Sequence, residues 1–197
     1  DFTINAMAMA LNGEIVDYYG GQKDLDKKVI RTVGEPFDRF KEDALRLLRA
    51  IRFSGRFGFA IEPKTERAMV KLAGSIKFIA NERIRDEITK IIAGPNPYYG
   101  FKKLHETKLL QYILPELTAG YGIEQNHHHV YTIFEHNLLS LKHCPSNDPM
   151  VRLAALLHDI GKTKAKKTIA GQVTFYNHEY ISAKQTKKIM ERIHFSN

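Results

Sequence analysis

The chain has 197 residues, of which 43% are hydrophobic and 26% charged, values ordinary for a globular protein with one large or two small domains. No apolar run approaches the roughly 20 residues that span a bilayer, and the single Cys144 excludes a disulfide framework within the chain and favours a reducing, cytoplasmic location. The formal net charge of +8 attracts phosphate backbones, although many basic proteins bind no nucleic acid.

The first 34 residues predict short strands. The segment "AMAMALNGEIVDYYGG" (6–21) predicts a β-hairpin, because Asn12-Gly13 tolerates the positive φ of a tight turn. Gly20-Gly21 then breaks the returning strand, and "KKVIRTVG" (27–34) indicates one more short strand. The chain therefore begins with a small β region.

From Gly34 onward the apolar residues follow a helical period. The spacing predicts one continuous helix from Pro36 to about Gly55, with a single apolar stripe. Further helices are predicted over 65–72, 82–92 (capped by Asn81) and 98–106, before the segment 109–122 closes this part. After a His-rich loop, helices are predicted in the second half of 124–143, in 149–162 and at the end of 172–193.

Charged residues lie at the edge of the first helical stripe. At about 100° per residue, Arg39, Asp43 and Arg46 fall within one narrow sector. An Asp beside an Arg offers acceptors and a fork of donors, which suits the pairing edge of a nucleobase. The same pattern also suits a solvated, salt-bridged helix face, and spacing alone favours that simpler interpretation.

Four motifs in order along the chain favour base recognition over a solvated helix face: "DFTINA" (1–6), "DYYGGQKDL" (17–25), "EDALR" (42–46) and "ERIRDE" (82–87). Together they closely resemble the class II tRNA nucleotidyltransferase and bacterial poly(A) polymerase family. The resemblance implies that Asp1 and Asn5 contact the ribose, and that Asp43 and Arg46 select CTP and ATP by the base edge. It further implies that Arg49 helps hold phosphates and that three residues brace the pocket: Glu82, Arg83 and Glu87.

Members of that family carry a Gly-rich loop and a DxD-type carboxylate pair before "DFTINA", and these carboxylates bind the catalytic Mg²⁺ ions. No such motif stands in this sequence, so we expect a fragment that lacks the catalytic half of the site and contains no catalytic residue. Asp24 and Asp26 also form a DxD string, but its place in the presumed hinge predicts a turn rather than a metal site.

A second constellation comprises His136, the pair His158-Asp159, and His178. Imidazole and carboxylate groups are suitable ligands for a transition metal, although nine histidines make an accidental His-Asp pair unremarkable. "FEHNLLSL", "LAALLHDIGK" and "FYNHEYISA" resemble the HD phosphohydrolase superfamily, which implies a divalent transition metal bound by these four residues. The closing Asp of that pattern is not seen. The run 127–129 adds three histidines that we expect to be solvated.

The sequence thus predicts a mainly α protein with three parts: a β-hairpin remnant of an α/β nucleotidyltransferase head (1–33), a helical neck and body (34–122), and an incomplete HD domain (123–197). The resemblance implies a nucleotidyltransferase that adds CCA to tRNA from CTP and ATP. Poly(A) polymerase, an HD-type phosphodiesterase or phosphatase, and a non-catalytic RNA-binding module remain the alternatives. Basic residues on the last helix suit either tRNA phosphates or a solvated face: Lys184, Lys187, Lys188 and Arg192.

Overall fold

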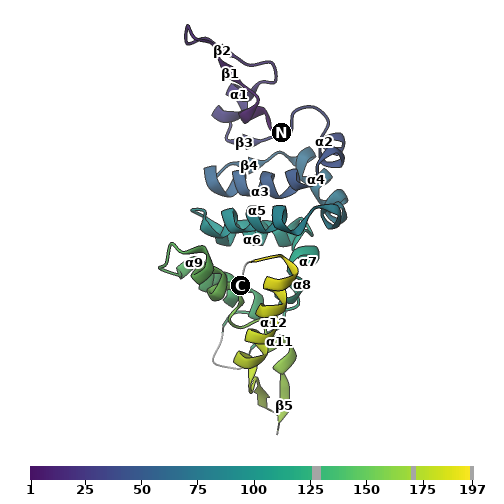
Figure 1. The fold of residues 1–197 in the computed structure, drawn as a ribbon, viewed down its shortest axis with the longest axis vertical. Helices are drawn as coiled ribbons and strands as arrows, with labels where there is room; N and C mark the ends of the chain where they lie inside the picture. The colour runs from purple at the N-terminus through teal and green to yellow at the C-terminus, as the bar shows by residue number, and fades with distance from the viewer. Residues whose placement is uncertain (126–129, 170–171, 196–197) are drawn as a thin grey trace.

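The computed structural model describes residues 1–125, 130–169 and 172–195. The chain runs along the long axis of the molecule from the N-terminal hairpin at one end to a second hairpin at the other, and the last helix then returns toward the middle (Figure 1). The prediction of a mainly α-helical chain preceded by a short β-hairpin is confirmed. In the described part of the chain, no helix has both the length and the apolar character needed to cross a membrane.

The N-terminal region contains the predicted hairpin in a shorter form. Strands β1 (Ala8–Met9) and β2 (Ile15–Val16) pair antiparallel, and Gly13 in the turn between them has a φ of +85°. A 3₁₀ turn, η1 (Thr3–Asn5), precedes them, and helix α1 (Gly21–Asp26) follows. The prediction of a turn at Asp24-Asp26 was therefore wrong, since both residues lie in α1.

Strand β3 (Val29–Ile30) pairs parallel with β4 (Ala60–Ile61), which the sequence did not predict. The paired residues are 31 positions apart in the chain, so this pairing attaches the N-terminal region to the helical part of the protein. Ile30 and Ile61 are both buried at the junction.

The first long helix is divided in two, contrary to the prediction of one continuous helix. Helix α2 (Pro36–Glu42) ends at Asp43, whose backbone is extended, and α3 (Leu45–Phe57) begins two residues later. The Asp43 carboxylate accepts a hydrogen bond from the Leu45 backbone N–H at 3.0 Å. This bond satisfies a donor at the start of α3, so an acidic residue favours a new helix here over continuation of the old one.

The middle of the chain folds into short helices close to those predicted. They are α4 (Pro63–Leu72), η2 (Ala73–Phe78), α5 (Asn81–Ala93), α6 (Pro97–Glu106), α7 (Leu110–Ile113) and α8 (Pro115–Thr118). Asn96 caps α6 through its side chain, which accepts from the Tyr99 N–H at 3.3 Å. The expected cap at Asn81 was wrong, because Asn81 is the first residue of α5 and Ala80 precedes it without a side-chain bond.

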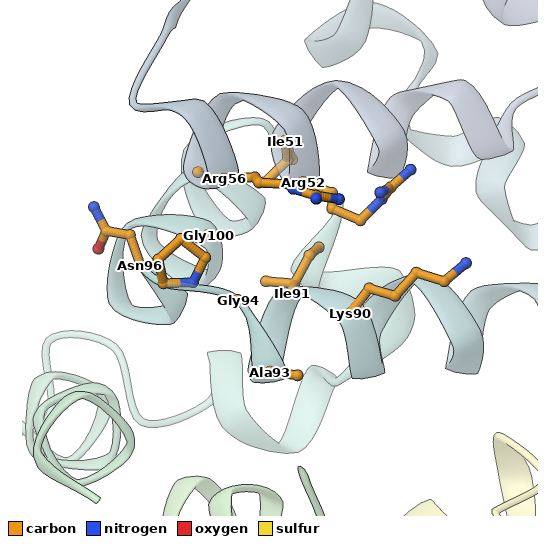
Figure 2. A pocket seen from close by; sticks show the side chains of 11 residues that line it. Ile51, Arg52, Arg56, Lys90, Ile91, Ala93, Gly94, Asn96 and Gly100 are labelled. Carbon is orange, nitrogen blue, oxygen red and sulfur yellow. The ribbon is translucent and has the colours of Figure 1, made fainter. Parts of the chain in front are cut away.

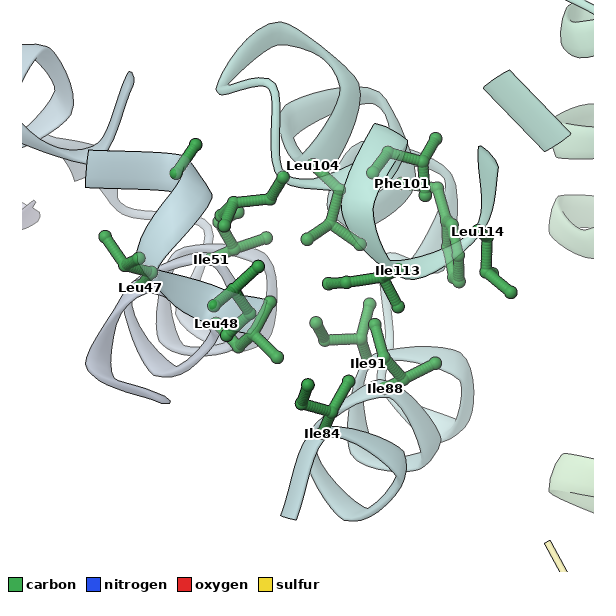
Figure 3. Close-up of a cluster of buried hydrophobic side chains, with 14 of the residues drawn as sticks. Leu47, Leu48, Ile51, Ile84, Ile88, Ile91, Phe101, Leu104, Ile113 and Leu114 are labelled. Atoms are coloured by element: carbon green, nitrogen blue, oxygen red, sulfur yellow. The ribbon is translucent and has the colours of Figure 1, made fainter. Parts of the chain in front are cut away.

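The core of this middle part forms where α3, α5, α6 and the α7–α8 segment meet. Figure 3 shows aliphatic side chains from α3 and α5 facing Phe101 and Leu104 of α6, with Ile113 between them. Leu47, Leu48 and Ile88 are fully buried there. Burying each such side chain contributes about 1.5–3 kcal/mol to stability, so this cluster fixes the relative positions of α3, α5 and α6.

The C-terminal part is a helical unit with a small hairpin. Its elements are α9 (Ile133–His143), α10 (Pro149–Leu157), α11 (Lys162–Ala165), β5 (Lys167–Ile169), β6 (Gln172–Thr174) and α12 (His178–Arg192). The β5–β6 hairpin was not predicted, and the predicted helix over 149–162 ends at Leu157. The histidine run 127–129 lies outside the described residues.

Candidate functional site: an aspartate–arginine cluster and a His-Asp cluster

Asp1 and the arginines of α3 form the first polar cluster, although they are far apart in sequence. The Arg46 Nε atom donates to Asp1 Oδ1 at 2.9 Å, and Arg49 Nη1 lies 2.6 Å from Asp1 Oδ2. Arg46 Nη1 also donates to the Arg39 carbonyl oxygen at 2.8 Å and to Glu42 Oε2 at 2.7 Å. These contacts fix the Arg46 guanidinium between the N-terminal segment and α2.

Asp43 lies at the junction of α2 and α3 rather than on the helix that carries Arg46, which corrects the expectation of a shared helix face. Arg83 Nη2 of α5 donates to Asp43 Oδ2 at 2.9 Å. Partial burial opposes ionisation of Asp43, but the Arg83 hydrogen bond, the Leu45 N–H and the charges of Arg83 and Arg46 outweigh it and lower the pKa. Asp43 is therefore held as a carboxylate acceptor close to Arg46.

The other predicted residues of this cluster occupy three different environments. Asn5 is exposed, and its side-chain oxygen accepts from the Phe2 N–H at 3.0 Å. Of the three residues expected to brace the pocket, only Arg83 contacts Asp43. Glu87 instead accepts from Arg52 Nε at 2.6 Å, and Glu82 Oε1 lies 2.7 Å from His194 Nδ1 in the C-terminal part.

The acidic residues of the N-terminal region are engaged in local structure. Asp24 is 5% exposed, and its Oδ2 accepts from Thr3 Oγ1 at 2.7 Å and from Arg31 Nε at 3.0 Å. Asp17 accepts from the backbone N–H groups of Gly21 and Gln22 at 2.8 and 2.9 Å, which caps the start of α1. These hydrogen bonds give both acids a structural role in the N-terminal region.

The second cluster forms around the Asp159 carboxylate, which is buried. Oδ2 of Asp159 lies 3.1 Å from His136 Nε2 and 3.3 Å from His158 Nε2, and Oδ1 lies 3.3 Å from His178 Nε2. The facing nitrogens of His136 and His158 are 3.2 Å apart. Ligand atoms of His136, His158 and Asp159 all lie within 4.8 Å of one another, a spacing that could hold a metal ion.

The orientation of two imidazoles favours metal binding through Nε2. His158 Nδ1 donates to the Ala155 carbonyl oxygen at 2.9 Å and His178 Nδ1 donates to the Phe175 carbonyl oxygen at 2.8 Å, because a carbonyl can only accept. Donation from Nδ1 leaves Nε2 as the lone-pair atom of a neutral ring. The hydrogen bond to Asp159 raises the pKa of His158, against the opposing effect of burial.

Two residues of this cluster were missed by sequence reasoning. Lys162 Nζ lies 2.6 Å from Asp159 Oδ2 and donates to Gln125 Oε1 at 2.7 Å. Gln125 in turn donates to the Tyr131 carbonyl oxygen at 3.1 Å, next to the start of α9. The signal was the Lys that closes "HDIGK", three residues after Asp159, and therefore near it on one helical turn. Nothing in the sequence pointed to Gln125.

Comparison with known proteins matches three stretches of the chain. Models of three families match: "Poly A polymerase head domain" over residues 1–31, "Probable RNA and SrmB- binding site of polymerase A" over 58–120, and "HD domain" over 127–196. These matches define the class of protein: part of a poly(A) polymerase-type nucleotidyltransferase joined to an HD domain. The chain belongs to the class II tRNA nucleotidyltransferase and poly(A) polymerase family.

Individual relatives are similar over different lengths. An A-adding tRNA nucleotidyltransferase of Deinococcus radiodurans is 37% identical over 98% of this chain and 46% of its own length. A CCA-adding enzyme of Bacillus subtilis is 47% identical over 64% of this chain and 31% of its own. The structure of the Bacillus stearothermophilus CCA-adding enzyme with CTP is 45% identical, with a TM-score of 0.55, over 55% of this chain and 28% of that one. The chain thus spans half or less of the length of these relatives.

Proposed function

We propose that the protein containing this chain is a tRNA nucleotidyltransferase that transfers CMP and AMP from CTP and ATP to tRNA 3′ ends and releases pyrophosphate. In this reaction Asp43 and Arg46 read the base edge, while Asp1 and Asn5 contact the ribose and Arg49 contacts phosphate. Residues 1–33, 34–122 and 123–197 act as head remnant, neck and body, and HD domain. Poly(A) polymerase is the alternative within the same family.

The observation that carries the proposal is the convergence of Asp1, Arg46 and Arg49 beside the Asp43–Arg83 pair. A fixed carboxylate and a fixed guanidinium present acceptors and donors in a set direction, which is the requirement for selecting a base without a template strand. Two relatives that match 98% of this chain are named an A-adding tRNA nucleotidyltransferase and a multifunctional CCA protein, which supports the same chemistry.

Divalent metal ions belong to this family and to HD domains. The polymerase Mg²⁺ ions neutralise charge on the transferring phosphate, and we propose that their carboxylate ligands lie outside this segment. A transition metal at the second cluster would be held by His136, His158, Asp159 and His178, whose donor set of three imidazoles and one carboxylate suits such an ion. The protein's own residues orient these ligands through Nδ1 and through Lys162.

A second activity is favoured by that cluster. We propose that the HD domain hydrolyses a phosphate ester in a metal-dependent reaction, because a metal that binds water lowers its pKa and supplies a nucleophile. Release of phosphate that depends on added Ni²⁺, Mn²⁺ or Co²⁺, and that disappears in His158→Ala, would support it. We also propose a cytoplasmic location, where tRNA is matured and where a single cysteine remains reduced.

Base selection can be tested in the intact enzyme with Asp43→Ala. We expect weaker incorporation and a blurred choice of CTP and ATP over GTP and UTP, with a loss of about 1–3 kcal/mol of discrimination per missing base-edge contact. Asp38→Ala, which removes an exposed carboxylate of α2, is the matched control and should leave selection unchanged. Unaltered incorporation of all four nucleotides by Asp43→Ala would reduce the Asp43–Arg83 pair to a structural salt bridge.

A further inference from the structure

A cavity of about 470 Å³ lies between α3, the end of α5 and the start of α6. Ile51 and Ile91 form part of its apolar floor, and Arg52, Arg56 and Lys90 line it from two helices. Figure 2 shows the two arginines along the edge of α3, with Lys90 extending from α5 on the facing side. The cavity therefore combines a small apolar surface with three cations.

The cations of this cavity outnumber the carboxylates near them. Glu87 is 5% exposed and does not line the cavity. It lies 2.6 Å from Arg52 and 3.0 Å from Lys90, so it orients both side chains. Arg56 lies against the ring of Phe57, 5.7 Å from its centroid, and forms no salt bridge with any carboxylate in the described residues. One buried acid against three bases leaves the cavity positive and suited to an anion.

The cavity lies at the end of a row of arginines on α3. Arg46, Arg49, Arg52 and Arg56 recur at spacings of three, three and four residues, which places them along one side of the helix. This arginine row starts at the first polar cluster, where Arg46 contacts Asp1, and ends in the cavity. Ten residues of helix correspond to roughly 15 Å, which is the length of a few nucleotides of stacked strand.

We propose that the cavity binds a backbone phosphate of the RNA strand that accepts the new nucleotide, a few positions before its 3′ end. The proposal rests on the proposed transfer to tRNA, because the acceptor 3′ end must then reach the Asp43–Arg46 region. A strand that ends there can follow the arginine row, with a phosphate at Arg56 and Lys90 and its ribose on the apolar floor. The first three arginines of the row are already paired with carboxylates, so Arg56 at its end supplies the charge that remains for a backbone phosphate.

The test is binding of a labelled tRNA that lacks its terminal CCA, measured by fluorescence anisotropy across a salt series. Arg56→Ala and Lys90→Ala should each weaken binding roughly three- to tenfold and reduce the slope of log Kd against log salt by about 1. Arg56→Lys, which keeps the charge, should retain most of the affinity. Lys102→Ala, an exposed lysine of α6 outside the cavity, is the matched control and should leave the slope unchanged.

Binding of CTP and ATP alone, measured on the same variants, should be unchanged. Weaker nucleotide binding with normal tRNA binding would assign the cavity to a mononucleotide and overturn the proposal. Normal affinity and slope for tRNA in both alanine variants would also overturn it while leaving the proposed function intact. A parent protein that binds no tRNA would overturn the proposed function itself. Arg56 is exposed, so loss of folding does not confuse these outcomes; equal thermal midpoints verify this.

Discussion

Asp159 shows how one buried carboxylate can organise a polar cluster. Burial opposes its ionisation, but the hydrogen bonds and positive charges of His158 and Lys162 outweigh burial and hold its pKa far below the ordinary value. The carboxylate is thus ionised at any physiological pH. A metal can bind to an ionised carboxylate without first displacing a proton from it.

Metal content is the direct measure of this cluster. Protein purified without chelator should contain about one equivalent of a divalent transition metal, and His158→Ala should lower the affinity roughly tenfold or more, because one Nε2 ligand is lost. Elemental analysis of dialysed protein measures the difference. His143→Ala, at the exposed end of α9, should keep the metal of the parent protein. Equal content in the parent and His158→Ala, or none in either, contradicts the site.

Among the secondary-structure elements, the turn after α10 makes an unusually close approach to α12. A Cβ atom at Gly161 would lie 2.4 Å from the His178 carbonyl oxygen and 2.5 Å from the Ser182 nitrogen. The Gly161 N–H also donates to Ser182 Oγ at 2.9 Å. Only glycine allows this contact, and the contact brings the His158-Asp159 segment and His178 together.

Gly161→Ala should therefore destabilise the protein and disturb the His-Asp cluster. We expect a loss of about 1–3 kcal/mol in the free energy of unfolding, since backbone atoms must move apart. Gly55→Ala, within α3, is the matched control: its Cβ would make ordinary contacts at 3.6 Å with Asn96 and Tyr99, and it should stabilise by about 0.5–1 kcal/mol. Denaturant unfolding of both variants measures the difference. A neutral Gly161→Ala would show that α12 moves away at little cost.

The order of the helices could be predicted from sequence because apolar periodicity is a local signal. The break at Asp43 could not, since the stripe from Phe37 to Ile51 keeps its helical spacing across it and only the Asp43–Leu45 hydrogen bond reveals the new start. The β3–β4 pair is two residues long and depends on a distant partner. His136, His158, Asp159 and His178 were predicted together by motif, whereas Gln125 reaches the cluster only through tertiary contact with Lys162.

Across the whole molecule, α12 connects the C-terminal part to the middle helices. Arg192 makes a paired contact with Glu116 of α8, with nitrogen–oxygen distances of 2.6 and 2.8 Å, and also donates to the Ile113 carbonyl oxygen at 3.2 Å. Burial raises the pKa of Glu116, but the hydrogen bonds and charge of Arg192 outweigh it, so the pKa is lowered below the ordinary 4.5. The two parts are therefore joined by a pH-dependent contact.

A carboxyl whose pKa is lowered by folding stabilises the folded state at pH values above its ordinary pKa. This stabilisation is lost as the pH falls through the lower pKa of the folded state. Glu116→Gln should cost about 1 kcal/mol at neutral pH and flatten the fall in stability below about pH 4.5, because the glutamine does not titrate. Denaturant unfolding at a series of pH values measures both effects. Glu191→Gln, on the exposed side of α12, should follow the parent curve. An unchanged curve for Glu116→Gln contradicts a role for this pair.

Helix α12 begins at His178, beside Asp159, and just beyond its other end His194 meets Glu82 on α5, the helix whose Arg83 bonds Asp43. Its 15 residues form a rod of about 22 Å. In the proposed function, a metal ion at His178 and a nucleotide at Asp43 would therefore bind at opposite ends of this connection. If binding of the metal moves α12, thermodynamic reciprocity requires the metal and the nucleotide to change each other's affinity by the same factor.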